Sequence, residues 1–227
     1  MNKEFQEVRE FHQKFGHPTS DVPVPLTEDR AKKRYTWMLE EMNEFLTAVK
    51  EKDIVEQADA MIDTIYFALG TLVEMGVQPD ALFRIVQHAN MSKLWYDGKP
   101  HYNEMGKVIK PEGWENPHMK LQEAIQNMNS SNLIDSTMVD YMIDYQYNEV
   151  RNFQQAFGHP ISDVPVLLTE DRAKKRYAWM LEEINEFLDA VKKQDIVEQA
   201  DAMIDTIYFA LGTLVEMGVK PGILFDI

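Results

Sequence analysis

One block of sequence occurs twice in this chain. Residues 15–78 align with residues 157–220 at a constant offset of 142, with eight substitutions in sixty-four positions and no gap. A repeat of this length decides the architecture, because each copy builds the same structural unit. We therefore predict two similar units, residues 1–128 and 143–227, joined by a linker at 129–142.

Apolar residues in each copy recur every three to four positions, which is the period of an α-helix. In the first copy this pattern predicts helices over about 5–15, 28–50, 54–76 and 79–95. Residues 16–25 contain three prolines and no period, so we expect a loop there.

Helix ends and breaks follow from the same sequence. Thr27 and Asp53 are the expected N-caps of two of these helices, and the basic run 30–34 is expected to be solvated at a helix start. Residues 97–117 are rich in Gly, Pro and Lys and are expected to be irregular, while 118–147 should be helical with a polar break near 127–132. No stretch alternates with the period of a strand, so the predicted fold is all-α, with the two copies packed as a pseudo-dimer.

Composition excludes several classes of function. The net charge of −15 argues against a nucleic-acid or anionic-membrane surface. No apolar run approaches the roughly 18 residues of a spanning helix, and the N-terminus lacks a signal-peptide core. The absence of cysteine excludes disulfides, thiolate metal sites and a cysteine nucleophile, and it fits a reducing, cytoplasmic location.

Both copies carry the same pattern of acidic residues on two consecutive predicted helices. On the helix from Asp53, a rotation of about 100° per residue places the acids in one stripe with Tyr66, between apolar neighbours. The acids are Glu40, Glu41, Glu44, Glu56, Asp59 and Asp63 in the first copy and Glu182, Glu183, Glu186, Glu198 and Asp201 in the second.

A single acidic pair on a helix is ordinarily a solvated surface feature, but two facing patches are different. Like charges about 4 Å apart cost on the order of 4 kcal/mol at an effective dielectric near 20, so such a cluster must be protonated or neutralised by a cation. Oxygen ligands alone indicate Mg²⁺ or Mn²⁺. A di-iron bundle would need Glu-x-x-His pairs on helices, and the pair Glu115 and His118 is interrupted by Pro117.

This layout resembles the all-α NTP pyrophosphohydrolases, the MazG-like and phosphoribosyl-ATP pyrophosphohydrolase-like superfamily. The resemblance covers residues 3–117 and 145–227. It rests on Glu-Glu-x-x-Glu followed by Glu-Gln-Ala-Asp-Ala-x-x-Asp, then on Asn-Met-Ser-Lys at 90–93 and Gly-Lys-Val-Ile-Lys-Pro at 106–111.

The resemblance implies an all-α NTP pyrophosphatase bundle and Mg²⁺-dependent cleavage between the α- and β-phosphates of NTPs or dNTPs, giving a monophosphate and pyrophosphate. Glu40 and Glu41 would be catalytic, with Glu40 orienting the attacking water or a second ion. The phosphates would contact Asn90, Lys93, Lys107 and Lys110. The metal ligands would be Glu41, Glu44, Glu56, Asp59 and Asp63, and in the second copy Glu183, Glu186, Glu198 and Asp201.

The second copy departs from this pattern, because it stops at Ile227, the counterpart of Ile85, and has no equivalents of the phosphate-binding residues. The second site is inactive, or borrows these residues from another copy or chain, or the sequence is a truncated product. We also expect a dimer of chains, because short helices leave apolar surface uncovered. A non-catalytic helical interaction protein and a nucleotide-binding regulator that keeps the metal without turnover are the alternative functions.

Overall fold

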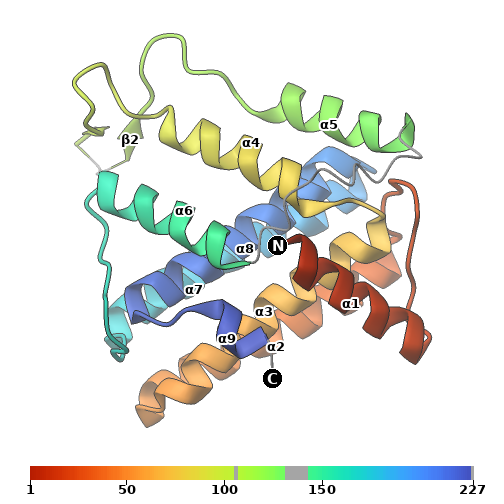
Figure 1. Ribbon diagram of the computed structural model, residues 1–227, viewed down its shortest axis with the longest axis horizontal. Helices are drawn as coiled ribbons and strands as arrows, with labels where there is room; N and C mark the ends of the chain where they lie inside the picture. Colours follow the sequence, from red (N-terminus) through yellow and green to blue (C-terminus); the bar gives the residue numbers. More distant parts are fainter. Residues whose placement is uncertain (105–106, 131–142, 226–227) are drawn as a thin grey trace.

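The computed structural model describes residues 1–104, 107–130 and 143–225, and nearly all of this part of the chain is helical (Figure 1). One antiparallel hairpin pairs His101 with Ile109 and Tyr102 with Val108. The fold is therefore all-α, as predicted. The elements are α1 (Asn2–Phe15), α2 (Glu28–Glu51), α3 (Ile54–Met75), α4 (Pro79–Met91), β1 (His101–Tyr102), β2 (Val108–Ile109), α5 (His118–Ser130), α6 (Ile143–Ala156), α7 (Glu170–Lys192), α8 (Ile196–Met217) and α9 (Pro221–Phe225).

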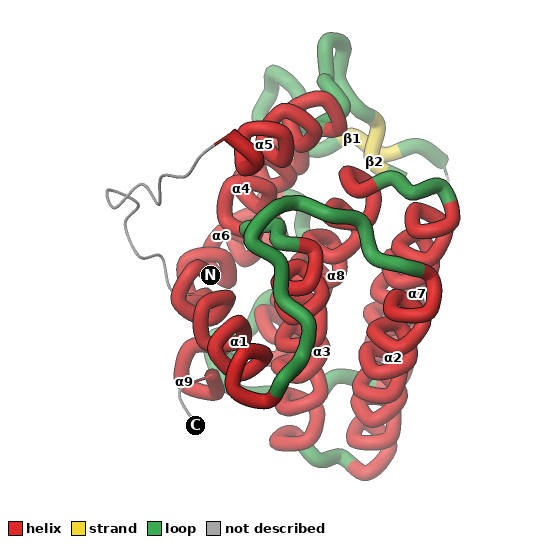
Figure 2. The backbone as a smooth tube through the Cα atoms, turned by 90° about the vertical axis from the view of Figure 1, so that its right-hand side faces the viewer, coloured by secondary structure: helices red, strands yellow, loops and turns green. Residues whose placement is uncertain are grey.

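The four long helices α2, α3, α7 and α8 form a bundle, in which α3 and α8 lie in the middle of the molecule and α2 and α7 lie along one outer side (Figure 2). Within each repeat the two long helices pack along one another, and across the repeats α3 packs on α8 and α2 on α7. Two reciprocal hydrogen bonds join the copies: Tyr35 donates to Asn185 Oδ1 and Tyr177 donates to Asn43 Oδ1, each at 3.1 Å. These symmetric contacts confirm the predicted pseudo-dimer. No single described helix has the length and apolarity needed to cross a membrane.

Some of the outer helices pack on their own repeat, and others pack on the other repeat. Helices α1 and α6 each cover the long helix of their own repeat, α3 and α8 respectively. In contrast, α4 and α5 of the first repeat pack on α8 of the second, and α9 of the second packs on α3 of the first (Figure 1). The repeats thus exchange the segments that follow their second long helix. This exchange determines which side chains meet in each candidate site.

The predicted unit boundaries lie largely outside the described residues. Residues 131–142, most of the predicted linker, are not described, and the described part at 129–130 belongs to α5. The helix therefore continues through the start of the polar break expected near 127–132.

Capping side chains explain where the long acidic helices begin. Asp53 accepts hydrogen bonds from the backbone N–H groups of residues 55 and 56, and Asp195 does the same for residues 197 and 198, at 2.9–3.2 Å. Gly76 and Gly218 end these helices in the left-handed conformation, which glycine adopts at little cost. Thr27 occupies the N-cap position of α2 without a side-chain hydrogen bond.

Two further expectations were wrong. Helix α4 ends at Met91, short of residue 95, where the hydroxyl of the C-cap Ser92 donates to the carbonyl of Ala89 at 2.8 Å and competes with the helical pattern. The segment 97–117 contains the two-residue strands β1 and β2, which are too short to show an alternating pattern in the sequence.

The basic run 30–34 is solvated only in part. Arg30 donates two hydrogen bonds of 2.6 Å to the carboxylate of Glu74, and Arg34 is 3% exposed with its Nε donating to Thr71. Lys32 and Lys33 are exposed as expected. The two arginines lie one helical turn apart, so they share the inward face of α2 and pair with a buried acid on α3.

Candidate active site

The first acidic cluster lies between α2, which carries Glu41 and Glu44, and α3, which carries Asp59 and Asp63. Burial first, and then the nearby carboxylates of Asp63, Glu44 and Asp59, raise the pKa of Glu41 to about 7. The pKa of Asp63 is raised to about 6 by burial and by its acidic neighbours Asp59 and Glu44. The facing helices therefore bring together four of the predicted ligands.

The second acidic cluster, between α7 and α8, is more strongly perturbed. Burial first, and then the carboxylates of Asp205 and Glu186, raise the pKa of Glu183 to about 9. The pKa of Asp205 is raised to about 8, mainly by burial and then by Asp201. Burial also raises the pKa of Asp201 to about 6, and its buried Oδ1 has no hydrogen-bond partner.

Asp205 was missed among the second-copy ligands, although its counterpart Asp63 was predicted in the first. The offset of 142 was the signal that would have found it. Of the remaining predicted acids, Glu40, Glu56 and Glu198 are exposed. Glu198 accepts a 2.7 Å contact from His118 Nδ1, which comes from the start of α5 in the other repeat.

Of the predicted phosphate-binding residues, Lys93 lies near an acid of the second cluster, Asp205. Lys93 is partly buried; burial lowers the pKa of its ammonium and Lys110 adds to this, while the adjacent carboxylate of Asp205 raises it. Lys93 Nζ donates to Asn90 Oδ1 at 2.7 Å. Lys110 Nζ lies 3.7 Å from the ring centroid of Trp114.

We call this group of Asn90, Lys93 and Lys110 the cationic arm. The fourth predicted residue, Lys107, is exposed in the hairpin, and Gly106 of the same motif lies outside the described residues. The arm belongs to the first repeat and its acidic partner to the second. This arrangement is compatible with the second site borrowing these residues from the first copy, one of the possibilities that the sequence left open.

Tyr208 lies where the arm, the acids and a cavity meet. Its hydroxyl donates to Gln87 Oε1 at 2.7 Å, and its ring stacks on Phe83 of α4 at 5.7 Å between centroids. Burial raises the pKa of Tyr208 well above its ordinary value, and the charge of Asp205 contributes. Its counterpart Tyr66 is only partly buried. The sequence did not single out Tyr208.

The donor atoms suit a hard divalent cation, but they are not arranged as a finished ligand shell. Within residues 1–104, 107–130 and 143–225, no group of three or more His, Asp or Glu side chains is placed to hold a metal ion. The chemistry still fits, because the second cluster consists of carboxylates that raise one another's pKa and includes the unpartnered Asp201 Oδ1. Binding would require these side chains to turn toward a common point.

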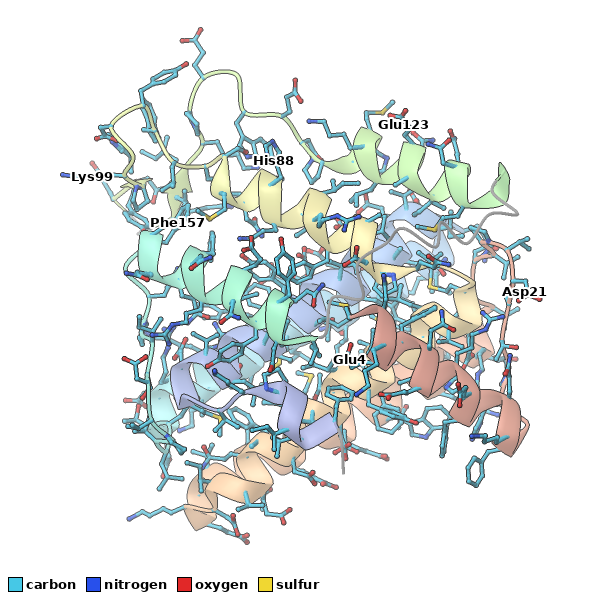
Figure 3. The ribbon with its side chains drawn as sticks, viewed as in Figure 1. Glu4, Asp21, His88, Lys99, Glu123 and Phe157 are labelled. Carbon is cyan, nitrogen blue, oxygen red and sulfur yellow. The ribbon has the colours of Figure 1, made fainter. Side chains whose placement is uncertain are left out.

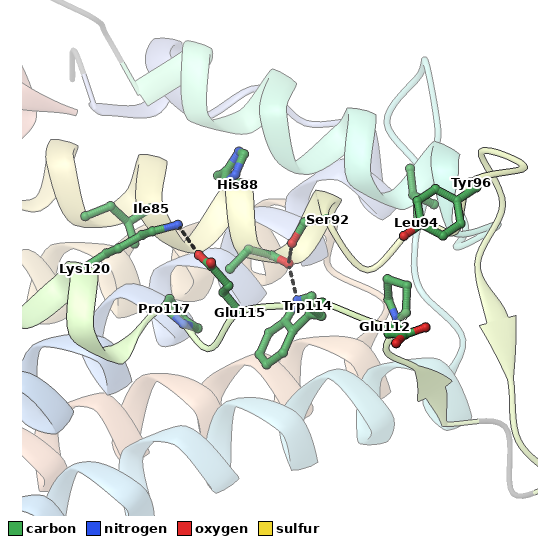
Figure 4. Close-up of a pocket in the computed structure, with 13 residues that line it drawn as sticks. Ile85, His88, Ser92, Leu94, Tyr96, Glu112, Trp114, Glu115, Pro117 and Lys120 are labelled. Atoms are coloured by element: carbon green, nitrogen blue, oxygen red, sulfur yellow. Dashed lines mark hydrogen bonds and ion pairs between the residues drawn. The ribbon is translucent and has the colours of Figure 1, made fainter.

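Two cavities lie near α4 and α8. One of about 300 Å³ lies between α4 and residues 111–120, where Trp114 Nε1 donates to the carbonyl of Ala89 and Lys120 pairs with Glu115 (Figure 4). His88, labelled in Figure 3, also lines it. This cavity is on the face of α4 turned away from α8 and includes neither acidic cluster. A second cavity of about 200 Å³ borders Tyr208.

Comparison with known proteins agrees with this geometry. The family model described as phosphoribosyl-ATP pyrophosphohydrolase matches residues 8–90 and again 150–227. A comparison with curated proteins finds none that matches the chain. The two matched segments contain both acidic clusters and end at Asn90 in the first repeat, so the family match does not extend to Lys93 or Lys110. Since the matches cover well over half of the sequence, the chain belongs to the phosphoribosyl-ATP pyrophosphohydrolase family, within the MazG-like all-α pyrophosphohydrolases that hydrolyse phosphoric anhydrides.

Proposed function

We propose that this chain is a Mg²⁺-dependent nucleoside triphosphate pyrophosphohydrolase whose working site combines the second acidic cluster with the cationic arm of the first repeat. The observation that carries the proposal is the position of Lys93 beside Asp205. A polyanionic substrate needs cationic partners for its phosphates, and an acidic cluster without them would repel it.

The residues have distinct tasks in this proposal. Lys93 and Lys110 bind the non-bridging phosphate oxygens as point charges, with Asn90 holding the Lys93 ammonium in place. Mg²⁺ or Mn²⁺, held by Glu183, Glu186, Asp201 and Asp205, would supply activation of water and neutralisation of the phosphate charge. Glu182, the counterpart of Glu40, orients the attacking water.

The reaction is a single displacement. A bond forms between water oxygen and phosphorus while the P–O bond of the α–β bridge breaks, so that a monophosphate and pyrophosphate leave. A carboxylate of the cluster that does not hold the ion takes the proton of the water as the bond forms. The substrates are NTPs or dNTPs, in keeping with removal of unwanted nucleotides from the pool.

The test is a panel of nucleoside triphosphates incubated with Mg²⁺, with pyrophosphate and orthophosphate measured separately. Pyrophosphate as the product supports cleavage at the α–β bridge, and orthophosphate alone contradicts it. Thermal stabilisation by nucleotide and Mg²⁺ without any product would instead support the nucleotide-binding regulator, and no stabilisation by either would support the interaction protein.

The duplicated sequence supplies a matched pair of variants that locates the site. Glu183→Gln is expected to lower turnover by about a hundredfold or more, because a ligand of the ion is lost. Glu41→Gln, the same change in the first repeat, is expected to stay within about twofold of the native rate. Two variants with equal losses would contradict assignment of the reaction to the second cluster.

A further inference from the structure

A cavity next to the second acidic cluster has the composition of a site for a flat aromatic ligand. It measures about 200 Å³ and has aromatic walls with three polar side chains between them. The aromatic residues are Phe153, Trp179, Tyr208 and Phe209, and the polar ones are Gln154, His159 and Arg176. Whole small ligands usually occupy about 300–1,000 Å³, so this space suits one ring system rather than a complete nucleotide. Aromatic walls favour such a ring by stacking.

Glycine at position 212 lets two polar side chains of the cavity wall pack directly against α8. A Cβ atom at Gly212 would lie 2.2 Å from Arg176 Nη2 and 2.7 Å from Gln154 Oε1. Any larger residue on this turn of α8 would therefore displace these two polar groups.

One polar atom in the cavity wall has no partner. Gln154 is 2% exposed; its Nε2 donates to the carbonyl of Pro160 at 2.7 Å, but its buried Oε1 accepts no hydrogen bond. Arg176 makes no hydrogen bond to this oxygen; its Nε donates to Thr213 Oγ1 at 3.0 Å and its Nη2 to the carbonyl of Phe209 at 2.5 Å. A buried acceptor without a donor is costly, which indicates that a ligand supplies one.

The first repeat presents an acceptor at the same point with a different side chain. His12 is the counterpart of Gln154, and its Nδ1 lies 2.9 Å from the carbonyl of Pro18. Since a carbonyl only accepts, Nδ1 carries the proton, and Nε2 is the acceptor of the neutral ring. A Cβ at Gly70 would lie 2.9 Å from this Nε2. Two unlike residues thus provide the same hydrogen-bonding function.

The residue after α6 is covered by the hairpin, whereas its counterpart at the end of α1 is exposed. Tyr102 of β1 donates to the carbonyl of Phe157 at 2.8 Å, and Phe157, labelled at the end of α6 in Figure 3, is 4% exposed. Its counterpart Phe15 is 69% exposed. The hairpin, which lies between Lys93 and Lys110 of the arm, is therefore bonded to the end of α6. Phe157 at that end stacks on Phe153 of the cavity wall.

We infer that this cavity receives the base of the nucleotide, and that Gln154 Oε1 accepts a hydrogen bond from an exocyclic amino group on it. An amino group projects from the edge of a base. A ring N–H lies beside carbonyl oxygens whose lone pairs would face the same acceptor. The inference rests on the proposed function for the identity of the ligand as a nucleotide, and it adds selection for amino-bearing bases.

The test uses product-like monophosphates, so it requires neither metal nor turnover. Binding is followed by quenching of Trp179 fluorescence, with Trp179→Phe identifying the signal among the four tryptophans. Three pairs of probes differ only in the amino group: AMP and purine riboside monophosphate, CMP and the monophosphate of pyrimidin-2-one riboside, and GMP and IMP.

We expect the native chain to bind the amino-bearing member of at least one pair about tenfold to a hundredfold more tightly. Gln154→Met, which keeps the shape but removes the acceptor, is expected to make the two members equal. Gln154→His, which copies the first repeat, is expected to keep the preference. Equal binding within all three pairs by the native chain, or quenching that survives Trp179→Phe, overturns the inference.

The outcome separates this inference from the proposed reaction. Selective binding of a monophosphate without pyrophosphate release from the matching triphosphate would retain the base site and reject the hydrolase. Pyrophosphate release from triphosphates, together with equal binding of both monophosphates in every pair, would retain the hydrolase and reject the base site.

Discussion

In the proposed site, Lys93 is the side chain that links the two repeats. It comes from the turn after α4, yet the carboxylate that acts on it, Asp205, belongs to α8. Lys93→Ala is expected to lower kcat/KM by about tenfold to a hundredfold, because a phosphate contact in a partly buried site is lost.

The control for this variant is Lys120→Ala. Lys120 is an exposed lysine that pairs with Glu115 at 2.9 Å in the other cavity, so its removal should leave kcat/KM within about twofold. The measurement is pyrophosphate release over a range of substrate concentrations. Equal effects of the two substitutions would mean that Lys93 acts only through general surface charge.

The sequence was enough to predict most of the acidic residues of the two clusters, but not the side chains that pack around them. Glu41, Asp59 and Asp201 follow from helical periodicity, which is a local property. Tyr208 and Gln154 could not be assigned a role, because each depends on neighbours more than fifty residues away. Arg34 was misjudged for the same reason, since its buried partner Thr71 lies on another helix.

At the scale of single elements, local signals were reliable where capping chemistry is strong. Asp53 and Asp195 each accept two backbone hydrogen bonds at the start of a long helix. Asp53→Ala and Asp195→Ala are each expected to cost about 1 kcal/mol of unfolding free energy, or about 2–4 °C in Tm.

Thermal unfolding of the two variants by circular dichroism provides the measurement. Since α3 and α8 have identical sequences and matching caps, the two losses should agree. Thr27→Ala, at an N-cap position without a side-chain hydrogen bond, is the control and should change Tm by much less. A loss for Thr27→Ala equal to the other two would contradict the capping explanation.

The packing partners of α4 could not be predicted from sequence. Its helical pattern identifies an apolar face, but that face fits α3 of its own repeat and the nearly identical α8 equally well. The path of the chain in the folded protein decides between these two helices, and in the structure α4 packs on α8. The hairpin β1–β2 was missed for a simpler reason, since strands of two residues carry no period.

For the whole molecule, the two acidic clusters make stability depend on pH. The pKa values of Glu41, Asp205 and Glu183 are raised to about 7, 8 and 9. When the pKa of a carboxyl group is higher in the folded state, the free energy of unfolding of the protein decreases as pH rises. The decrease runs from the ordinary pKa of the group, near 4, to the raised pKa. His12 and His159, whose pKa values burial lowers, act in the opposite direction near pH 6.5 and below.

We therefore expect the Tm of the protein in chelator to fall between pH 7 and pH 9, above the range in which the histidines titrate. Glu183→Gln should flatten this slope, because it removes the group with the highest raised pKa of the second cluster. A Tm that rises over this interval, or a slope unchanged by Glu183→Gln, would contradict the electrostatic explanation.

Divalent cations should reverse the trend. Mg²⁺ or Mn²⁺ competes with protons for carboxylates, so stabilisation by the cation is expected to grow with pH. Calorimetric scans with Mg²⁺ and with chelator, at pH 6, 7 and 8, measure it. Equal Tm values in the two conditions at all three pH values would remove the cation from the proposed site.

The exchange of outer helices between repeats has a consequence for how this gene can change over time. Selection on the working site acts on the first copy through its lysines and on the second through its carboxylates, so each half of the chain is held to a different task. Substitutions that would be harmless in one copy are damaging at the matching position of the other. Descendants of this duplication should accumulate complementary losses, and neither half could then replace its twin.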